Sequence, residues 1–406
     1  MLTEDFDYDL PEERIAQAPM EPRDACRLLV LGRESGSIEH RVFRDIVDYL
    51  HEGDLLVANE TRVLPARLLG RKAGTGGAAE VLLLRQNRPD IGDGTAIWEG
   101  LVKPGKRLKP GAVVEFFASG ADVQASHPER NEGPHQDTGG GSVRPCHPER
   151  SEGSHQERDE PAAPEGLPRE TPVLTAEILD WAPGGSRGER LIGLTSHVGS
   201  LQDAIHAVGR APLPPYIRGY EGDPELYQTV YSRRESSAAA PTAGLHFTPE
   251  LLDRTRAQGV GFATVELEVG LDTFRIVDEE RAEDHEMHTE VYHVPQATVD
   301  AIEAAKARGG RVIAVGTTSM RSLESAWDPT LGHLRARCGE STSLFILPGY
   351  EFHVADALIT NFHVPRSTLM MLVSAFSTRD NIMRAYRAAI DEGYRMLSFG
   401  DAMLIA

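Results

Sequence analysis

The chain has 406 residues, a formal net charge of −20, and 40% hydrophobic against 26% charged residues. This length predicts two domains, and the composition is typical of a globular protein. No apolar run approaches the length of a membrane span, and the acidic N-terminus does not resemble a signal peptide. The three cysteines form no CxxC pair, which argues against a disulfide scaffold or a cysteine-zinc site. We therefore expect a cytoplasmic protein without membrane contact.

The first sixty residues have an α/β pattern. Apolar residues recur at helical spacing over 43–51, and Gly53 is suited to end that helix. The apolar run 54–58 predicts a buried strand. It ends at a polar cluster that contains Arg62.

From about residue 67 the pattern changes to β. Glycine and proline separate six candidate strands, at 67–72, 79–86, 96–103, 113–118, 173–182 and 190–195. Six short strands with almost no helix predict a small barrel or sandwich.

A repeat interrupts this β region. A decapeptide rich in proline, glutamate and glycine begins at His127 and returns at His147. With almost no large apolar residues, it cannot bury enough surface to fold. We expect a disordered insert at about 126–171 rather than a metal-binding segment, because disordered residues rarely hold the fixed geometry that a metal requires.

The α/β pattern then returns. Helices are predicted at 201–208, 296–308 and 381–392, and one more begins at Thr248 as its N-cap and stops at Gly259. Strands are predicted at 261–269, 311–315, 356–360 and 395–399. The expected organisation is a discontinuous α/β domain, 1–62 with 200–406, and an inserted β domain, 63–199.

Ligands of open α/β sheets gather beyond the carboxyl ends of the strands. After the strand 311–315, Gly316, Thr317 and Thr318 open a helix, which suits a carboxylate or phosphate, and Arg321 could clamp it. A capped helix start with no ligand explains this segment equally well.

Asn361, Phe362 and His363 follow the strand 356–360, a combination suited to stacking on a base and bonding its edge. Buried asparagine and histidine often make only structural hydrogen bonds, so this alternative stays open.

Three further residues are candidate acids or bases. His246 follows a segment of small residues that begins near Thr242, Asp401 follows a glycine near the C-terminus, and His285 precedes His288 in an acidic turn. The spacing of the two histidines is one residue short of the HExxH motif, so no metal is expected. No Walker A loop or G-x-G-x-x-G follows a strand, which weakens any NTPase or dinucleotide hypothesis.

Taken together, ten collinear blocks resemble the S-adenosylmethionine:tRNA ribosyltransferase-isomerase family of queuosine biosynthesis. The blocks are 9–12, 27–31, 61–68, 213–217, 227–231, 240–247, 283–288, 312–325, 360–376 and 394–405. The resemblance implies an α/β mixed-sheet domain that carries an inserted six-stranded β-barrel. The chain departs from the usual pattern at the insert, at 236–237 and at 270–276, which puts the loop before Thr273 in doubt.

The resemblance also implies the reaction. The ribosyl part of S-adenosylmethionine moves to 7-aminomethyl-7-deazaguanine at the tRNA wobble position and is isomerised, with release of adenine and methionine, to give epoxyqueuosine. It implies a monomer and no metal or cofactor beyond this cosubstrate.

Roles for the candidate residues follow from that reaction. Thr317, Thr318 and Arg321 would bind the methionine carboxylate, and His246, His285 or Asp401 would remove a proton beside the sulfonium. Asn361, Phe362 and His363 would hold the adenine and the deazaguanine, with Thr242 and Gly316 beside them.

The acidic net charge disfavours indiscriminate RNA binding, so a tRNA substrate requires a local basic face. The tRNA-binding candidates are Arg62, Arg67 and Lys103, with Arg71, Lys72, Lys106, Arg107 and Lys109 nearby. Two rival hypotheses remain. One is a methyltransferase, which would normally carry a glycine-rich loop after its first strand, and the other is a tRNA-binding module without activity.

Overall fold

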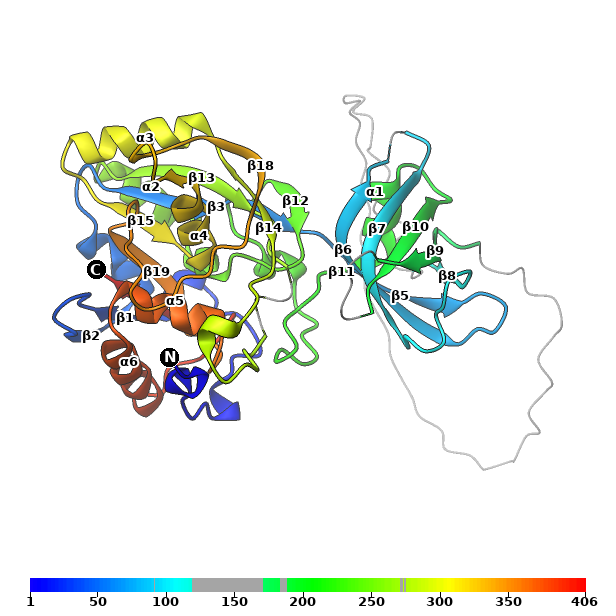
Figure 1. Cartoon of the computed structure of the whole chain (residues 1–406), viewed down its shortest axis with the longest axis horizontal. Coiled ribbons are helices and arrows are strands. Elements are labelled where there is room, and N and C mark those ends of the chain that lie inside the picture. The colour runs from blue at the N-terminus through cyan, green and yellow to red at the C-terminus, as the bar shows by residue number, and fades with distance from the viewer. Residues whose placement is uncertain (91, 119–170, 183–187, 271–272, 274) are drawn as a thin grey trace, which may run out of the picture.

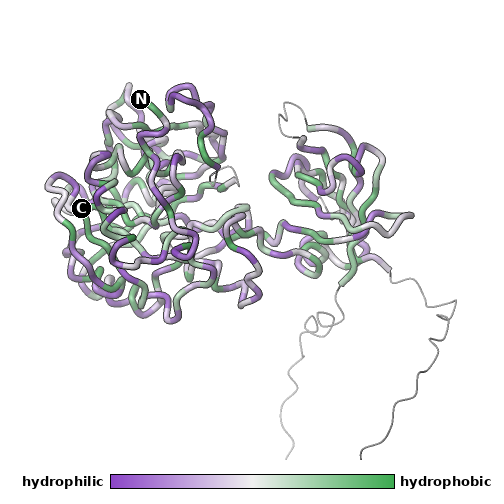
Figure 2. Tube along the Cα trace, turned by 90° about the horizontal axis from the view of Figure 1, so that it is seen from below, coloured by the Kyte–Doolittle hydropathy of each residue, from purple (hydrophilic) through white to green (hydrophobic). Residues whose placement is uncertain are grey.

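The computed structural model describes residues 1–90, 92–118, 171–182, 188–270, 273 and 275–406. Two bodies are joined by narrow connections, and both views place the barrel to one side of the α/β body (Figure 1, Figure 2). The predicted insert at 126–171 lies, apart from its last residue, outside the described part of the chain.

The barrel has the six strands expected from the sequence. They are β5 (Arg67–Lys72), β6 (Ala78–Arg88), β7 (Thr95–Lys103), β8 (Val113–Phe116), β9 (Leu174–Trp181) and β10 (Arg190–Ser196). Neighbours run antiparallel in the order β5-β6-β7-β10-β9-β8, and β8 pairs back with β5. Closure leaves the side chains of alternate positions, such as Val81, Ile178 and Ile192, to fill the interior.

Helix α1 (Leu201–Val208) belongs with the barrel, although the sequence suggested a return to the α/β domain at residue 200. Ser200 caps the helix by accepting a hydrogen bond from Asp203 N–H at 3.1 Å. Leu201, Ala204 and Ile205 join the barrel core, and β11 (Gly209–Arg210) then pairs with β5. The chain therefore leaves the barrel after β11.

The α/β body is built on a mixed sheet of nine strands in the order β18-β14-β13-β3-β15-β19-β20-β1-β2. Its strands are β1 (Arg27–Leu31), β2 (Ile38–Val42), β3 (Leu55–Asn59), β13 (Gly261–Leu267), β14 (Glu290–Val294), β15 (Val312–Val315), β18 (Arg337–Thr342), β19 (Ala357–Asn361) and β20 (Ala402–Ile405). β13, β3, β15 and β19 are parallel neighbours, whereas β20 runs antiparallel to β19. The predicted mixed α/β sheet with an inserted six-stranded barrel is thus confirmed.

Both faces of the central strands are covered. In β19, Ala357 and Ile359 face the side where α2 (Pro249–Ala257) and the 3-10 helix η4 (Phe43–Tyr49) pack. Leu358 faces the other side with α5 (Thr368–Phe376) and α6 (Arg379–Asp391), and α3 (Gln296–Ala307) and α4 (Thr317–Ala326) cover the same side further along the sheet. This burial explains why β15 and the first three residues of β19, Ala357–Ile359, are entirely apolar.

The helix predicted at 43–51 is present as a 3-10 helix over Phe43–Tyr49. One strand prediction in this body is wrong. The segment 395–399 is not a strand: Leu397 has a φ of 69°, a left-handed conformation that strand residues do not adopt. The real strand of this region is β20, a few residues later.

Smaller elements complete the described chain. Short strands pair as β12 (Arg234–Ser237) with β4 (Thr61–Val63) and β16 (Trp327–Asp328) with β17 (His333–Leu334). The 3-10 helices include η1 (Thr3–Phe6), η2 (Glu12–Arg14), η3 (Arg23–Ala25), η5 (Pro224–Tyr227), η6 (Thr242–His246) and η8 (Ala282–Asp284). No helix in the described ranges is long and apolar enough to cross a membrane.

A buried ion pair ties β14 to α4. The side chains of Arg321 and Glu290 are both almost fully buried and bonded to each other. Burial by itself would raise the pKa of Glu290. The charge of Arg321, the interaction with His288 and the hydrogen bond from Gly270 N–H together outweigh burial and lower this pKa to about 2. Glu290 also accepts a hydrogen bond from Gly270 N–H at 3.0 Å. The pair therefore anchors the loop that contains Thr273.

We expect this pair to be the main source of acid sensitivity. Since the pKa of Glu290 is lower in the folded state, its ionised form stabilises the fold fully above about pH 5. This contribution to the free energy of unfolding, about 3 kcal/mol, is lost as the pH falls toward 2.

Arg321→Ala should lower the free energy of unfolding by about 3–5 kcal/mol near neutral pH because it leaves a buried charge unpaired. Glu80→Ala, which breaks an exposed pair with Arg67, should cost less than about 1 kcal/mol. Chemical denaturation across pH measures both, and equal costs for the two variants would contradict the assignment.

Candidate functional site

A pocket opens where β15 and β19 end. Its empty space, including the opening to solvent, is about 590 Å³. It is lined by residues from six segments: Tyr216, Ala240–Ala243, Val269 with Thr273, Gly316–Thr318, Thr360–Val364 with Ser367 and Leu369, and Leu397–Ser398. Of the eight substrate-binding residues predicted from the sequence, seven lie here; the exception is Arg321.

Two helices point their N-termini at this pocket. Gly316, Thr317 and Thr318 open α4, and Ser367, the N-cap of α5, also lines the pocket. Gly316 has a φ of 93°, which favours glycine. The Thr318 hydroxyl is buried and has no hydrogen-bond partner among the described residues. Free N–H groups, two helix dipoles and an unpartnered hydroxyl are features that favour binding of an anion.

Arg321 does not reach this anion site as the sequence suggested. It is one turn further along α4 and bonds Glu290 and the carbonyl of Leu344. Glu290 in turn holds Gly270 and lies 3.4 Å from the Thr273 hydroxyl. Arg321 therefore supports the wall of the pocket and does not touch its contents.

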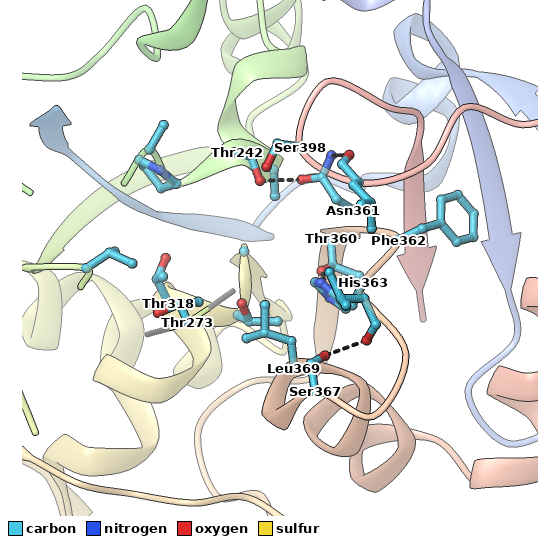
Figure 3. A pocket seen from close by; sticks show the side chains of 18 of the residues that line it. Thr242, Thr273, Thr318, Thr360, Asn361, Phe362, His363, Ser367, Leu369 and Ser398 are labelled. Atoms are coloured by element: carbon cyan, nitrogen blue, oxygen red, sulfur yellow. Dashed lines mark hydrogen bonds between the residues drawn. The ribbon is translucent and has the colours of Figure 1, made fainter. Parts of the chain in front are cut away.

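Asn361 is the centre of a hydrogen-bonded chain. Thr242 Oγ1 donates to Asn361 Oδ1 at 2.9 Å, and Asn361 Nδ2 donates to His246 Nε2 at 3.1 Å (Figure 3 draws the first bond). His246 Nδ1 lies 3.2 Å from Cys26 Sγ. Asn361 Nδ2 also donates to the carbonyl of Leu397 at 3.4 Å, so both amide donors are used, the orientation is fixed, and only Oδ1 can accept a further bond.

His246 itself lies behind Asn361 and lines a smaller, second pocket with Cys26 and Arg23. Burial, with smaller contributions from the charges of Arg23 and Arg395, lowers its pKa to about 3. The ring is therefore neutral near pH 7 and is separated from the larger pocket by the amide. It can orient Asn361 but is badly placed to take a proton from a ligand there.

The other two candidate bases are also outside the larger pocket. Asp401 accepts hydrogen bonds from the backbone N–H groups of Arg27 and Arg395, at 2.8 and 2.7 Å. Burial raises its pKa although these bonds oppose the rise. Asp401 thus fixes the loop that carries Ser398. His285 bonds Glu279 at 3.0 Å and packs edge-on against Phe345.

Phe362 and His363 point to different sides of the chain. The ring of Phe362 points away from the pocket and packs against Tyr386 and Tyr394, with centroids 5.1 and 5.7 Å apart, so it cannot stack on a ligand (Figure 3). His363 lines the pocket, and its Nε2 lies 2.8 Å from Thr360 Oγ1. Burial lowers the pKa of His363 to about 3. It is the one imidazole among the described residues that lines this pocket.

Sequence reasoning missed several lining residues. Tyr216 and Ser398 meet across the pocket wall through a 2.7 Å hydrogen bond between their hydroxyls. Tyr216 belongs to the segment 213–217, which was singled out only for its resemblance, and Ser398 was assigned to a strand. No group of three or more histidine, cysteine, aspartate or glutamate side chains in the described ranges is arranged to hold a metal.

The predicted tRNA-binding cations fall into two groups. Arg62 pairs with Glu225 and Glu235, and Arg67 forms a two-point contact with Glu80 at 2.9 and 3.1 Å. Lys103 is exposed at the end of β7 and takes part in none of the ion pairs between described residues.

Comparison with known proteins identifies the family. The family model described as "Queuosine biosynthesis protein" matches residues 3–405. Relatives named S-adenosylmethionine:tRNA ribosyltransferase-isomerase are 44% identical in Desulfitobacterium hafniense and 46% identical in Moorella thermoacetica, each over 405 residues and all of both chains. A crystal structure of an S-adenosylmethionine tRNA ribosyltransferase from Thermotoga maritima is 35% identical, covers 99% of this chain and 100% of that one, and has a TM-score of 0.48. The chain therefore belongs to the S-adenosylmethionine:tRNA ribosyltransferase-isomerase family, the enzymes of queuosine biosynthesis.

Proposed function

We propose that this enzyme transfers the ribosyl part of S-adenosylmethionine to 7-aminomethyl-7-deazaguanine at the tRNA wobble position and isomerises it to epoxyqueuosine. Adenine and methionine leave, and no cofactor beyond the cosubstrate takes part. The observation that carries this proposal is the pocket at the ends of β15 and β19. There an anion site lies beside a fixed amide and a neutral imidazole, in a chain of this family.

The anion site fits the methionine carboxylate. Thr318 contributes a hydroxyl without a partner, and the N-termini of α4 and α5 contribute backbone donors and positive potential. Arg321 is not proposed as a clamp, because it is not among the residues that line the pocket and its Nη1 is bonded to Glu290.

His363 is the proposed acceptor of the proton beside the sulfonium, in place of His246, His285 and Asp401. Its ring borders the pocket, while its backbone N–H bonds the Tyr386 hydroxyl at 2.9 Å and its carbonyl accepts from the Tyr8 hydroxyl at 2.6 Å. A held backbone fixes the ring in place. Its lowered pKa of about 3 keeps the ring unprotonated at neutral pH, and also makes it a weaker base than an ordinary histidine.

Other polar side chains of the pocket are suited to hold the adenine and the deazaguanine. Thr242 and Asn361 are oriented by their mutual bond, and Tyr216 and Ser398 by theirs. A site that bonds the edge of a base discriminates strongly, because a wrong base leaves these buried groups without partners.

The reaction is tested with purified protein, S-adenosylmethionine and tRNA that carries the aminomethyl-deazaguanine, with mass spectrometry of small molecules and digested nucleosides. Adenine, methionine and an epoxyqueuosine nucleoside are the expected products. S-adenosylhomocysteine with a methylated nucleoside would make the protein a methyltransferase instead. Bound tRNA without any turnover would reduce it to a binding module.

We expect Thr318→Val to weaken S-adenosylmethionine binding by about tenfold or more, because the variant keeps the shape and loses a hydrogen bond to a charged group. Decarboxylated S-adenosylmethionine should bind wild type and variant alike. Calorimetry measures both ligands. Ser325→Ala, on the same helix but outside the pocket and not bonded to Thr318, is the matched control. Equal losses with the two ligands would show that Thr318 does not bind the carboxylate.

Glutamine substitutions should distinguish the role of His363 as a proton acceptor from the role of His246 in orienting Asn361. His363→Gln should lower kcat by about 100-fold or more with S-adenosylmethionine affinity retained, because it removes a proton acceptor. His246→Gln should lose less than about tenfold, since the glutamine oxygen can still accept from Asn361, whereas His246→Leu should lose more. In NMR titrations neither ring should change protonation between about pH 5 and pH 8. The opposite ranking of the two glutamine variants would exchange the roles.

A further inference from the structure

The loop between β7 and β8 presents unpaired positive charge. Lys103, Lys106, Arg107 and Lys109 are all exposed, and within the described ranges none of them takes part in an ion pair. Among the other barrel arginines, Arg67, Arg85 and Arg88 are each paired with an acid, whereas Arg71, next to Lys72 in β5, takes part in no ion pair between described residues. The unpaired charge is thus concentrated at this loop and the end of β5.

A fifth cation joins the loop from a neighbouring strand. Lys72, the last residue of β5, donates from Nζ to the carbonyl of Arg107 at 3.1 Å. The chain has a net charge of −20, yet these five cations have no acidic partner among the described residues, so the local charge is positive. Like charges held together repel each other, and a polyanion relieves that repulsion.

An exposed aromatic ring lies beside the same loop. Trp181, the last residue of β9, is 53% exposed. The guanidinium of buried Arg190 lies 3.3 Å from the centre of its ring, and Arg190 also donates to the carbonyl of Gly105 at 3.5 Å. Arg190 therefore supports one face of the ring next to the loop. The exposed part of the ring can stack on an unpaired base.

These residues gather at one end of the barrel. β5, β7 and β9 finish there with Lys72, Lys103 and Trp181, and β10 begins there with Arg190. The chain enters the barrel at the opposite end, at Arg67, where β11 pairs with β5 (Figure 1). The pocket of the α/β body contains no barrel residue. A ligand that contacts both places must therefore be long.

We propose that this barrel-end surface, made of Lys72, Lys103, Lys106, Arg107, Lys109 and Trp181, binds the tRNA substrate away from the reacting base. The cations contact backbone phosphates, and Trp181 stacks on an unpaired base. The inference rests on the proposed function for the identity of the RNA. It retains Lys103 from the sequence-based candidates and removes Arg62 and Arg67, whose charges are neutralised by Glu225, Glu235 and Glu80.

The test is a direct measurement of tRNA binding by fluorescence anisotropy over a range of salt concentrations. A triple variant, Lys106→Glu with Arg107→Glu and Lys109→Glu, should weaken tRNA binding by about tenfold or more. It should also reduce the slope of log affinity against log salt by about two to three. The matched control reverses three exposed arginines of the α/β body, Arg254→Glu with Arg308→Glu and Arg387→Glu. Because the change in net charge is the same, only a local contact distinguishes the two variants.

Trp181→Ala tests the stacking part separately. It should weaken tRNA binding by about fivefold or more without changing the salt slope, since stacking releases no counterions. An unchanged affinity for S-adenosylmethionine shows that each variant is folded. If the triple variant and the control bind tRNA equally, or if both barrel variants bind like wild type, the surface does not contact the RNA. Wild-type binding without ribosyl transfer would overturn the proposed function but not this surface.

Discussion

A single backbone hydrogen bond holds the site together. Gly316 N–H donates to the carbonyl of Ile359 at 2.8 Å, which closes the ends of β15 and β19 against each other. One side of this junction continues into α4 and the other into the segment 361–363. The N-terminus of α4 and the polar groups of 361–363 therefore lie side by side in the pocket because two parallel strands end together. The left-handed conformation of Gly316 lets the chain turn from strand to helix at this point.

The charged side chains nearest the pocket do not line it but hold the loops that carry its lining residues. Arg321 and Glu290 neutralise each other and hold the loop with Thr273, while Asp401 holds the loop with Ser398. Burying these charges costs desolvation energy, which the partners offset. The pocket is left lined by hydroxyls, an amide and a neutral imidazole. Such groups can bind a zwitterionic amino acid and two purine-like bases without presenting a competing fixed charge.

The two bodies differ in the features that they carry. The α/β body contains the pocket at the ends of β15 and β19, while the barrel carries, on the end remote from the linker, cations that pair with no acid of the described ranges. The proposed RNA contact would thus be local, on a chain whose net charge repels RNA elsewhere.

The sequence by itself determined every barrel strand, the cap of α2 by Thr248 and the helix start after Gly316. These depend on period-two alternation and on capping chemistry, which act between near neighbours. Tertiary structure alone decided the rest. Leu397 is left-handed in a turn that Asp401 ties to the remote N–H of Arg27 and to the nearby N–H of Arg395. Phe362 turns into the core because Tyr386 and Tyr394 are there. Whether His246 or His363 borders the pocket depends on which side of Asn361 each ring lies, a matter of long-range packing that local sequence patterns do not contain.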